Sequence, residues 1–132
     1  MIINIETREV KLIDFGSCTP LIPGKQASLF YGTKKFAAPE AIQNETYDPA
    51  AQEVWALGAL LYVLLFKMDP FKTDEDILET NMAQKIQRLR IGGYQSTSVS
   101  DDAVDAMLAM LKRDPIQRIS LSEIKQLSFM TI

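Results

Sequence analysis

The sequence predicts a mainly α-helical domain of the α+β class, in which a short β-hairpin and a long loop precede four to five helices. Two apolar runs near the N-terminus flank a polar turn, and residues 17–37 show no regular period. The remaining chain contains capped stretches with apolar residues at helical spacing. Its 132 residues are the size of one domain, and we predict that residues 1–132 form part of a single domain without linkers or repeats.

The hairpin is predicted from two apolar runs, Ile2 to Ile5 and Val10 to Ile13. Residues 6–9 between them are all polar, as expected of a turn. We expect the second strand to end at Asp14. Residues 17–37 contain two prolines and two glycines and predict a loop, which at this length within a domain is usually functional.

The main helix is predicted over residues 50–66, directly after the start signal Asp48-Pro49, and a short helix is predicted over 39–43. The main helix is apolar on all sides, which is typical of a buried helix. Four of its residues are expected in the core: Trp55, Leu57, Leu61 and Leu64. Its apolar run, Val54 to Phe66, is shorter than the roughly 20 residues that a transmembrane helix requires.

Three further helices are predicted towards the C-terminus. Residues 74–90 indicate one continuous helix, with Thr73 as its N-cap and Gly92-Gly93 as its stop signal. Ser100 is expected to cap the next helix, because two aspartates and an apolar stripe follow it. The motif from Ser120 to Glu123 is a capping box and predicts a last short helix.

The composition excludes several classes of function. The net charge of −3 and the scattered basic residues give no indication of a nucleic-acid or membrane partner. The absence of histidine excludes catalytic triads with histidine and most zinc sites. Cys18 is the only cysteine and is expected to be a small buried residue. With no signal-peptide pattern visible, we expect a cytoplasmic, intracellular protein.

Four short motifs follow one another along the chain. They are Asp14-Phe15-Gly16, the stretch from Gly32-Thr33 to Ala38-Pro39-Glu40, Val54-Trp55-Ala56-Leu57-Gly58, and Asp114-Pro115-Ile116-Gln117-Arg118. Each motif alone is weak, but their shared order is specific. In that order they resemble the later half of the C-terminal lobe of eukaryotic Ser/Thr protein kinases, over nearly the whole chain. Within that family, the sequence is most similar to PAS-domain kinases.

The resemblance implies a role for each residue of the first two motifs. Asp14 is implied as the ligand that holds Mg²⁺ against the phosphates of ATP, with Phe15 packed into the lobe to set its position and Gly16 supplying backbone freedom. Thr33, together with Gly32, is implied to lie beside the substrate hydroxyl, which favours Ser/Thr over Tyr specificity. The alternatives are an Asp14 that only ends a strand and a Thr33 that is an ordinary loop residue.

The same resemblance implies structural roles and one modification. Glu40 and Arg118 are expected to form a buried ion pair between the activation segment and the late helices. Trp55 is implied as a core residue, and Glu53 stands where most of the family has aspartate. Ser28 is the candidate phosphorylation site of the activation segment.

Other parts of a kinase have no counterpart in the 132 residues, namely the N-lobe with its Gly-rich loop and the catalytic loop with its base. We therefore expect this chain alone to be inactive and ATP and Mg²⁺ to bind only in the complete kinase, where the partners are a protein substrate and the missing N-lobe. One interpretation is a fragment of an active enzyme. The alternative is a pseudokinase-like binding or scaffold module, which is disfavoured because the cut exposes apolar surface.

Overall fold

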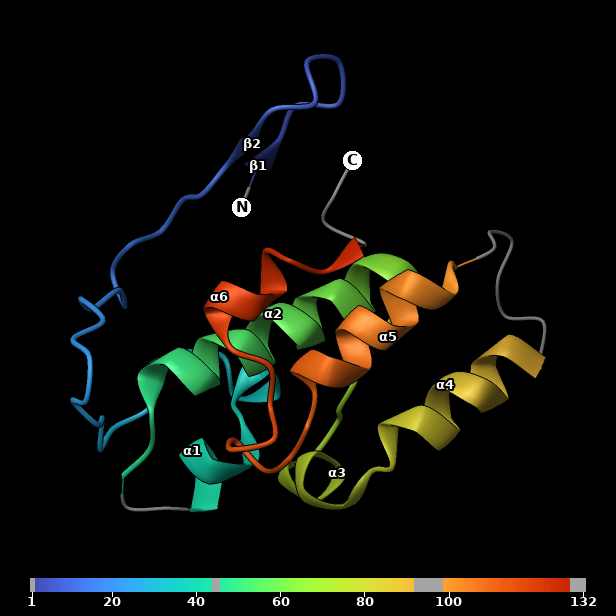
Figure 1. Ribbon diagram of the computed structural model, residues 1–132. Helices are drawn as coiled ribbons and strands as arrows, with labels where there is room; N and C mark the ends of the chain where they lie inside the picture. The colour runs from blue at the N-terminus through green and yellow to red at the C-terminus, as the bar shows by residue number, and fades with distance from the viewer. Residues whose placement is uncertain (1, 44–45, 92–98, 129–132) are drawn as a thin grey trace.

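The computed structural model describes residues 2–43, 46–91 and 99–128. The elements are the strands β1 (Ile2–Ile3) and β2 (Val10–Lys11), the 3₁₀ helix η1 (Lys34–Phe36), and the helices α1 (Pro39–Gln43), α2 (Pro49–Phe66), α3 (Asp74–Glu79), α4 (Met82–Ile91), α5 (Asp101–Met110) and α6 (Leu121–Ile124). The helices gather around α2, while β1 and β2 stand apart from them (Figure 1). The predicted class, mainly α with a hairpin and loop before the helices, is confirmed.

The hairpin is shorter than the sequence predicted. Strands β1 and β2 pair antiparallel with Ile2 opposite Lys11 and Ile3 opposite Val10. The first strand ends because the Asn4 side chain accepts hydrogen bonds from the backbone N–H groups of Glu6 and Thr7, which closes a local turn. Both strands are exposed on both faces, so no core packing extends them.

Helix α2 is the central element and agrees with its predicted range within one residue. The Asp48 carboxylate accepts a hydrogen bond from the Ala50 N–H at 2.9 Å, and Pro49 occupies the first turn, where its missing N–H costs nothing. The helix ends at Lys67, which adopts a left-handed conformation with φ of 56°. These end signals are local and strong, which explains the accuracy of the prediction.

Helices α2 and α5 pack closely because Gly58 has no side chain. A Cβ atom at Gly58 would lie 2.9 Å from both Leu111 Cγ and Met110 Cβ. The core around this contact includes Trp55 and Tyr62 on α2. The packing therefore depends on one small residue at the crossing of the two helices.

Burial of α2 is one-sided, which corrects the prediction that all its apolar residues lie in the core. Leu57 and Leu64 are 42% and 43% exposed, and Leu61 is only partly buried. Among the described residues, α2 is also long and apolar enough to span a membrane by length and composition alone, with a mean hydropathy of 1.5. The apolar run seen in the sequence is shorter than the helix because Pro49 to Glu53 add another turn and a half at its start.

The predicted single helix over residues 74–90 is wrong, because the structure has two helices, α3 and α4. The backbone of Thr80 is extended, with φ of −63° and ψ of 122°. The Asn81 side chain then accepts a hydrogen bond from the Gln84 N–H at 3.1 Å and starts α4. The number of α-helices among the described residues is therefore six. The predicted stop at Gly92-Gly93 lies outside the described residues.

The last two helices begin where the sequence predicted. The Ser100 hydroxyl accepts a hydrogen bond from the Ala103 N–H and caps α5. The capping box at Ser120 and Glu123 is present at the start of α6. The Ser120 hydroxyl and backbone N–H donate to the Glu123 carboxylate and hold its pKa below the ordinary value, with burial acting weakly in the opposite direction.

Candidate functional site

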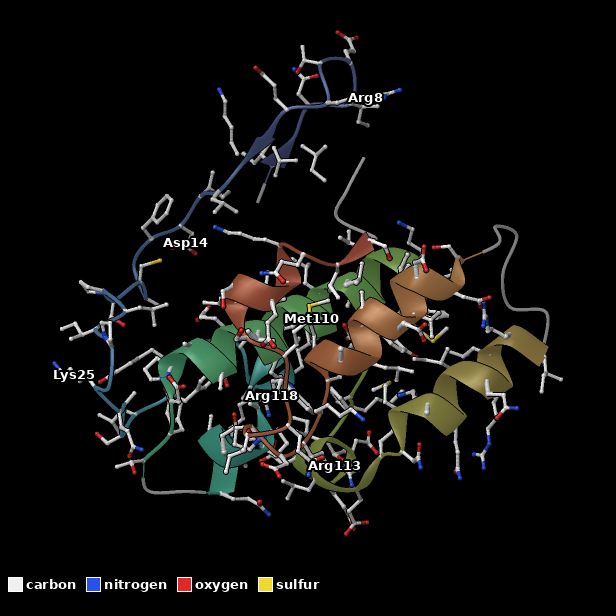
Figure 2. All side chains as sticks on the ribbon, in the orientation of Figure 1. Arg8, Asp14, Lys25, Met110, Arg113 and Arg118 are labelled. Carbon is white, nitrogen blue, oxygen red and sulfur yellow. The ribbon has the colours of Figure 1, made fainter. Side chains whose placement is uncertain are left out.

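Asp14 lies on an extended segment that leaves the hairpin outside the helical body (Figure 2). Its backbone is left-handed, with φ of 66°, a conformation that aspartate tolerates better than most residues. The carboxylate is exposed, and within the described part of the chain it makes no hydrogen bond or ion pair. A Cβ on Gly16 would lie at an ordinary contact distance of 3.6 Å from Asp14 Oδ1, so the turn leaves room beside the carboxylate.

Phe15 and Cys18 correct two expectations of burial. Phe15 is 64% exposed rather than packed into the core, and Cys18 is exposed as well. The physical reason is shared, since every described residue from Ile2 to Gln26 is exposed and this segment lies outside the helical body. The only local order at this point is a turn in which the Cys18 N–H donates to the Phe15 carbonyl at 3.1 Å.

Thr33 directly precedes η1 and is exposed. Its carbonyl accepts a hydrogen bond from the Phe36 N–H at 2.9 Å, so the backbone of this residue is part of the turn. Gly32, which precedes it, is exposed, and a Cβ atom at this position would lie 3.1 Å from the Phe30 ring. Within the described chain, no backbone hydrogen bond joins Gly32 or Thr33 to Asp14.

Two ion pairs attach η1 to the region around α3. Lys34 Nζ lies 3.3 Å from Asp74 Oδ2, and Lys35 Nζ lies 2.9 Å from Asp69 Oδ1. The side chains of all four residues are well exposed, so each pair is worth only about 0–1 kcal/mol. Their effect is to align the segment that follows Thr33 with the start of α3.

Ser28 lies between two points at which its segment is held. The neighbouring Ala27 pairs with Tyr47 through two backbone hydrogen bonds of 2.9 Å. The Tyr47 hydroxyl donates to the Leu29 carbonyl at 3.0 Å. Burial, then the charge of Glu53, raises the pKa of Tyr47. The Ser28 side chain is exposed, so the hydroxyl is accessible to a modifying enzyme.

Gln52 is a buried polar residue that the sequence analysis missed. Its Oε1 accepts a hydrogen bond from the Ala38 N–H at 2.7 Å, and its Nε2 donates to the Phe36 carbonyl at 3.0 Å. One side chain on α2 therefore satisfies both backbone groups at the end of η1. The sequence did contain a signal for this role, namely a single amide side chain on the buried side of a mostly apolar helix. Such a residue predicts hydrogen-bond partners, because buried polar groups require them.

Glu40 and Arg118 form the predicted ion pair, and it is buried and bidentate. Arg118 Nη1 donates to Glu40 Oε1 at 2.5 Å, and Arg118 Nη2 donates to Glu40 Oε2 at 2.9 Å. The side chain of Arg118 is 0% exposed and that of Glu40 is 5% exposed. Arg118 also donates to the carbonyl oxygens of Ala51, Lys112 and Arg113, so its guanidinium connects α1, α2 and the segment after α5 (Figure 2).

Trp55 is a core residue in the structure, whereas Glu53 is exposed. The Trp55 ring stacks on Phe71 with centroids 5.4 Å apart, and Arg118 Cζ lies 5.1 Å from the Trp55 ring. Within the described ranges, Glu53 makes no side-chain hydrogen bond. Trp55 therefore supports the ion pair by packing against its guanidinium.

The chemistry of Asp14 fits a magnesium ligand. Magnesium is usually held by one or two carboxylates together with substrate phosphates. Asp14 supplies one exposed carboxylate oxygen pair of the required kind. In residues 2–43, 46–91 and 99–128, no group of three or more His, Cys, Asp or Glu side chains is placed to hold a metal. Asp14 by itself could supply one carboxylate ligand to such a metal.

Comparison with known proteins identifies the family. The protein kinase domain model matches residues 1–130. The chain is 36% identical over 116 residues to "Aurora kinase" of Dictyostelium discoideum, 34% over 117 to "SNF-related serine/threonine-protein kinase" of Homo sapiens, and 35% over 115 to "Serine/threonine-protein kinase PSK2" of Saccharomyces cerevisiae. The chain therefore belongs to the protein kinase family, and its relatives are Ser/Thr kinases.

The chain spans only a small part of the length of the relatives that it matches. The alignments cover 88%, 88% and 87% of this chain, but only 28%, 14% and 10% of the three relatives. The three identities differ by two percentage points, from 34% to 36%. The matches are consistent with the narrower resemblance to PAS-domain kinases and do not separate it from other Ser/Thr kinases.

Proposed function

We propose that this chain contributes the activation segment and late helices of a kinase that transfers phosphate from ATP to Ser or Thr hydroxyls of proteins. The observation that carries the proposal is the exposed Asp14 carboxylate, held at a left-handed turn in a chain of the kinase family. Phosphoryl transfer depends mostly on positioning and charge neutralisation, and a carboxylate on Mg²⁺ contributes to both. When bound, ATP would supply the transferred phosphoryl group, and Mg²⁺ would supply the cation that balances its charge.

Each residue of the site then has a defined task. Asp14 binds the metal, and Gly16 allows the backbone next to it to change conformation when Phe15 packs inward. Thr33 orients the substrate hydroxyl from its place before η1, and Gly32 belongs to the same substrate-binding segment. The support for this division is that the Asp14 and Thr33 side chains are both exposed.

We further propose that the 132-residue chain by itself does not transfer phosphate. It contains no histidine and no His-Arg-Asp catalytic loop, so it supplies neither a catalytic base nor a second metal ligand. Phosphorylation of Ser28 is proposed as the regulatory modification. The partner is a protein substrate inside the cell, rather than nucleic acid or membrane, because the chain has a net charge of −3.

The test uses the longest natural product that contains this sequence, with its size first established by an antibody against residues 74–91. Replacing Asp14→Asn is expected to lower transfer of labelled phosphate to a Ser peptide on the order of 100-fold, because one electrostatic contact of the transition state is lost. Asp105→Asn changes an exposed aspartate on α5 in the same way and is the control.

The outcomes separate the proposal from its alternative. A Ser or Thr peptide phosphorylated by the parent and not by the Asp14→Asn variant supports the kinase role. Equal activity of the two aspartate variants contradicts the role of Asp14. A parent product of 14.8 kDa that transfers no phosphate favours the pseudokinase-like binding or scaffold module.

A further inference from the structure

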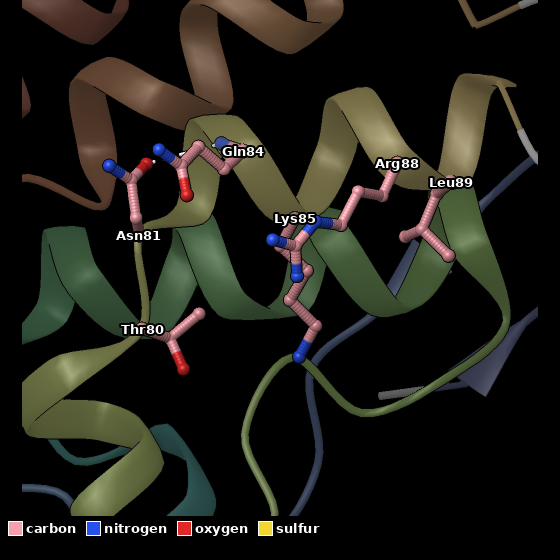
Figure 3. Close-up of a pocket in the computed structure, with 6 residues that line it drawn as sticks. All are labelled: Thr80, Asn81, Gln84, Lys85, Arg88 and Leu89. Atoms are coloured by element: carbon pink, nitrogen blue, oxygen red, sulfur yellow. Dashed lines mark hydrogen bonds between the residues drawn. The ribbon is translucent and has the colours of Figure 1, made fainter.

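A groove of about 510 Å³ runs along one face of α4. Its lining comes from residues spaced at successive turns of that helix and from the two residues before it (Figure 3): Thr80, Asn81, Gln84, Lys85, Arg88 and Leu89. Residues separated by three or four positions share one side of a helix, so these side chains form a continuous stripe. The groove is thus a surface feature of α4, on the opposite side of the helical body from Asp14 in the view of Figures 1 and 2.

Two cations, Lys85 and Arg88, are among the lining residues, and the only acidic influence on the pKa of Lys85 comes from Asp76, which lies outside the lining. Helix α4 contains Lys85, Arg88 and Arg90 and no acidic residue. Arg90 is engaged outside the groove, since it pairs with Asp101 at 2.7 Å. Arg88 makes no hydrogen bond or ion pair with the described residues, and both Arg88 and Lys85 line the groove (Figure 3). The lining therefore contains two like charges and no carboxylate.

Lys85 is a lining residue of this groove whose ammonium is held in place by two contacts. Its Nζ donates to the Pro70 carbonyl and lies 5.7 Å from the centre of the Tyr62 ring. Burial is the largest influence on the pKa of Lys85 and lowers it, while Asp76 acts in the opposite direction and Lys72 adds to the lowering. The ammonium retains further N–H groups that the Pro70 carbonyl does not use, and these can meet an anion from solvent.

The rest of the lining supplies hydrogen-bond donors and one apolar contact. Asn81 Oδ1 accepts the Gln84 N–H, which leaves the Asn81 amide nitrogen as a donor. The side chains of Thr80 and Gln84 add further polar groups at the same end. Leu89 provides an apolar surface at the other end. The combination suits a chain segment that carries both carboxylates and apolar side chains.

We propose that the α4 groove docks an acidic segment of a protein partner, with its carboxylates on Arg88 and Lys85 and an apolar side chain on Leu89. Charge complementarity is the argument for this occupant, because such pairing sets specificity and the rate of association. The proposal goes beyond phosphotransfer and requires neither Asp14 nor Thr33.

The test measures binding of a fluorescein-labelled peptide of alternating glutamate and leucine to the longest natural product that contains this sequence, by fluorescence anisotropy. Arg88→Glu is expected to weaken binding about tenfold or more, and Arg88→Gln by a smaller factor, because charge reversal adds repulsion. Lys25→Glu makes the same change of charge on the exposed N-terminal segment and should alter binding less than about twofold. Arg88 and Lys25 are both exposed, and circular dichroism verifies that each variant is folded.

A second peptide with glutamine in place of every glutamate should bind at least about tenfold more weakly than the acidic peptide. The proposal is overturned if the parent shows no saturable binding, or if Arg88→Glu and Lys25→Glu weaken it equally. It is also overturned if inorganic phosphate binds with the same dependence on Arg88 and displaces the peptide, since the groove then takes a free anion. Self-association of the parent that Arg88→Glu abolishes identifies a second copy as the occupant and contradicts a foreign partner.

Discussion

Arg118 makes five hydrogen bonds through its guanidinium, two of them to Glu40 and three to backbone carbonyl groups. A guanidinium in this position satisfies groups from three different parts of the chain at once. The pair is fully desolvated, so its importance lies less in its own attraction than in what remains when one partner is removed.

Glu40→Ala is expected to lower the free energy of unfolding by about 3–5 kcal/mol, because it leaves the Arg118 charge buried without a counter-ion. Urea denaturation followed by circular dichroism measures this change. Glu79→Ala removes an exposed carboxylate from the end of α3 and should change stability by less than about 0.5 kcal/mol. A Glu40→Ala chain as stable as the Glu79→Ala chain would contradict the structural role of the pair.

We expect the buried hydroxyl of Tyr62 to make the protein less stable at alkaline pH. Its hydroxyl is fully buried, has no hydrogen-bond partner among the described residues, and has its pKa raised by burial to about 12. Below about pH 10 the Tyr62 hydroxyl keeps its proton in both the folded and the unfolded chain. The free energy of unfolding therefore does not depend on this group in that range. Between about pH 10 and the folded pKa only the unfolded chain loses it, and the free energy of unfolding falls on the order of 2 kcal/mol.

Tyr62→Phe is the matched variant, because it removes the titrating hydroxyl and keeps the ring. Near neutral pH its stability should lie within about 1 kcal/mol of the parent, since no described hydrogen bond is lost. Above about pH 10 the parent should lose stability faster than the variant. Parallel stability curves for the two chains in alkali would exclude Tyr62 as the source.

At the scale of single residues, the sequence predicted a residue's role correctly where that residue lies in a motif. The Glu40–Arg118 pair was predicted because each partner lies in a recognisable motif. Gln52 belongs to no motif, and its role depends on where η1 places the Phe36 carbonyl and the Ala38 N–H, which no local pattern encodes. The exposure of Phe15 depends likewise on what covers it in three dimensions.

At the scale of elements, the crossing of α2 and α5 is governed by Gly58. Gly58→Ala is expected to lower the free energy of unfolding by about 1–2 kcal/mol, because overpacking outweighs the better helix propensity of alanine. The reason is the 2.9 Å approach of a Cβ atom to Leu111 and Met110. Thermal and urea unfolding of the variant give the value.

Leu57→Ala is the companion to that variant on the exposed side of α2. Because Leu57 is 42% exposed, its truncation should cost less than truncation of a fully buried leucine, which costs about 2–5 kcal/mol. A Gly58→Ala chain more stable than the parent would show that α5 moves aside without cost.

Helix ends were predictable where a cap and a breaker coincide, as at Asp48-Pro49 and Ser120. The break between α3 and α4 was missed because the apolar stripe continues across it. Thr80 and Asn81 have weak helix propensity, and Asn81 is a strong N-cap, so the break was encoded locally. Periodicity alone could not reveal it, since Ile77, Met82 and Ile86 are buried on both sides of the break.

At the scale of the whole molecule, the chain consists of a packed helical body and an exposed N-terminal segment. Trypsin is expected to cleave first after Arg8, Lys11 and Lys25, because these residues lie on exposed backbone outside the body (Figure 2). Cleavage after Arg118 should come last, since its side chain is 0% exposed. Mass spectrometry of timed digests identifies the order.

The same digest has a built-in control in the exposed arginine Arg88, which lies on a helix of the body. Cleavage there requires local unfolding of α4 and should therefore be slower than cleavage in the N-terminal segment. An early cut after Arg88 with an intact N-terminal segment would contradict the division into segment and body.

The separation of Glu40 and Arg118 has a consequence for the order of events during synthesis. The two residues are 78 positions apart, so the ribosome makes the arginine long after the glutamate. Until Arg118 emerges, α1 carries an acidic side chain that has no counter-ion for burial, and the nascent chain keeps that helix in water. Docking of α1 is therefore delayed until translation has passed the end of α5.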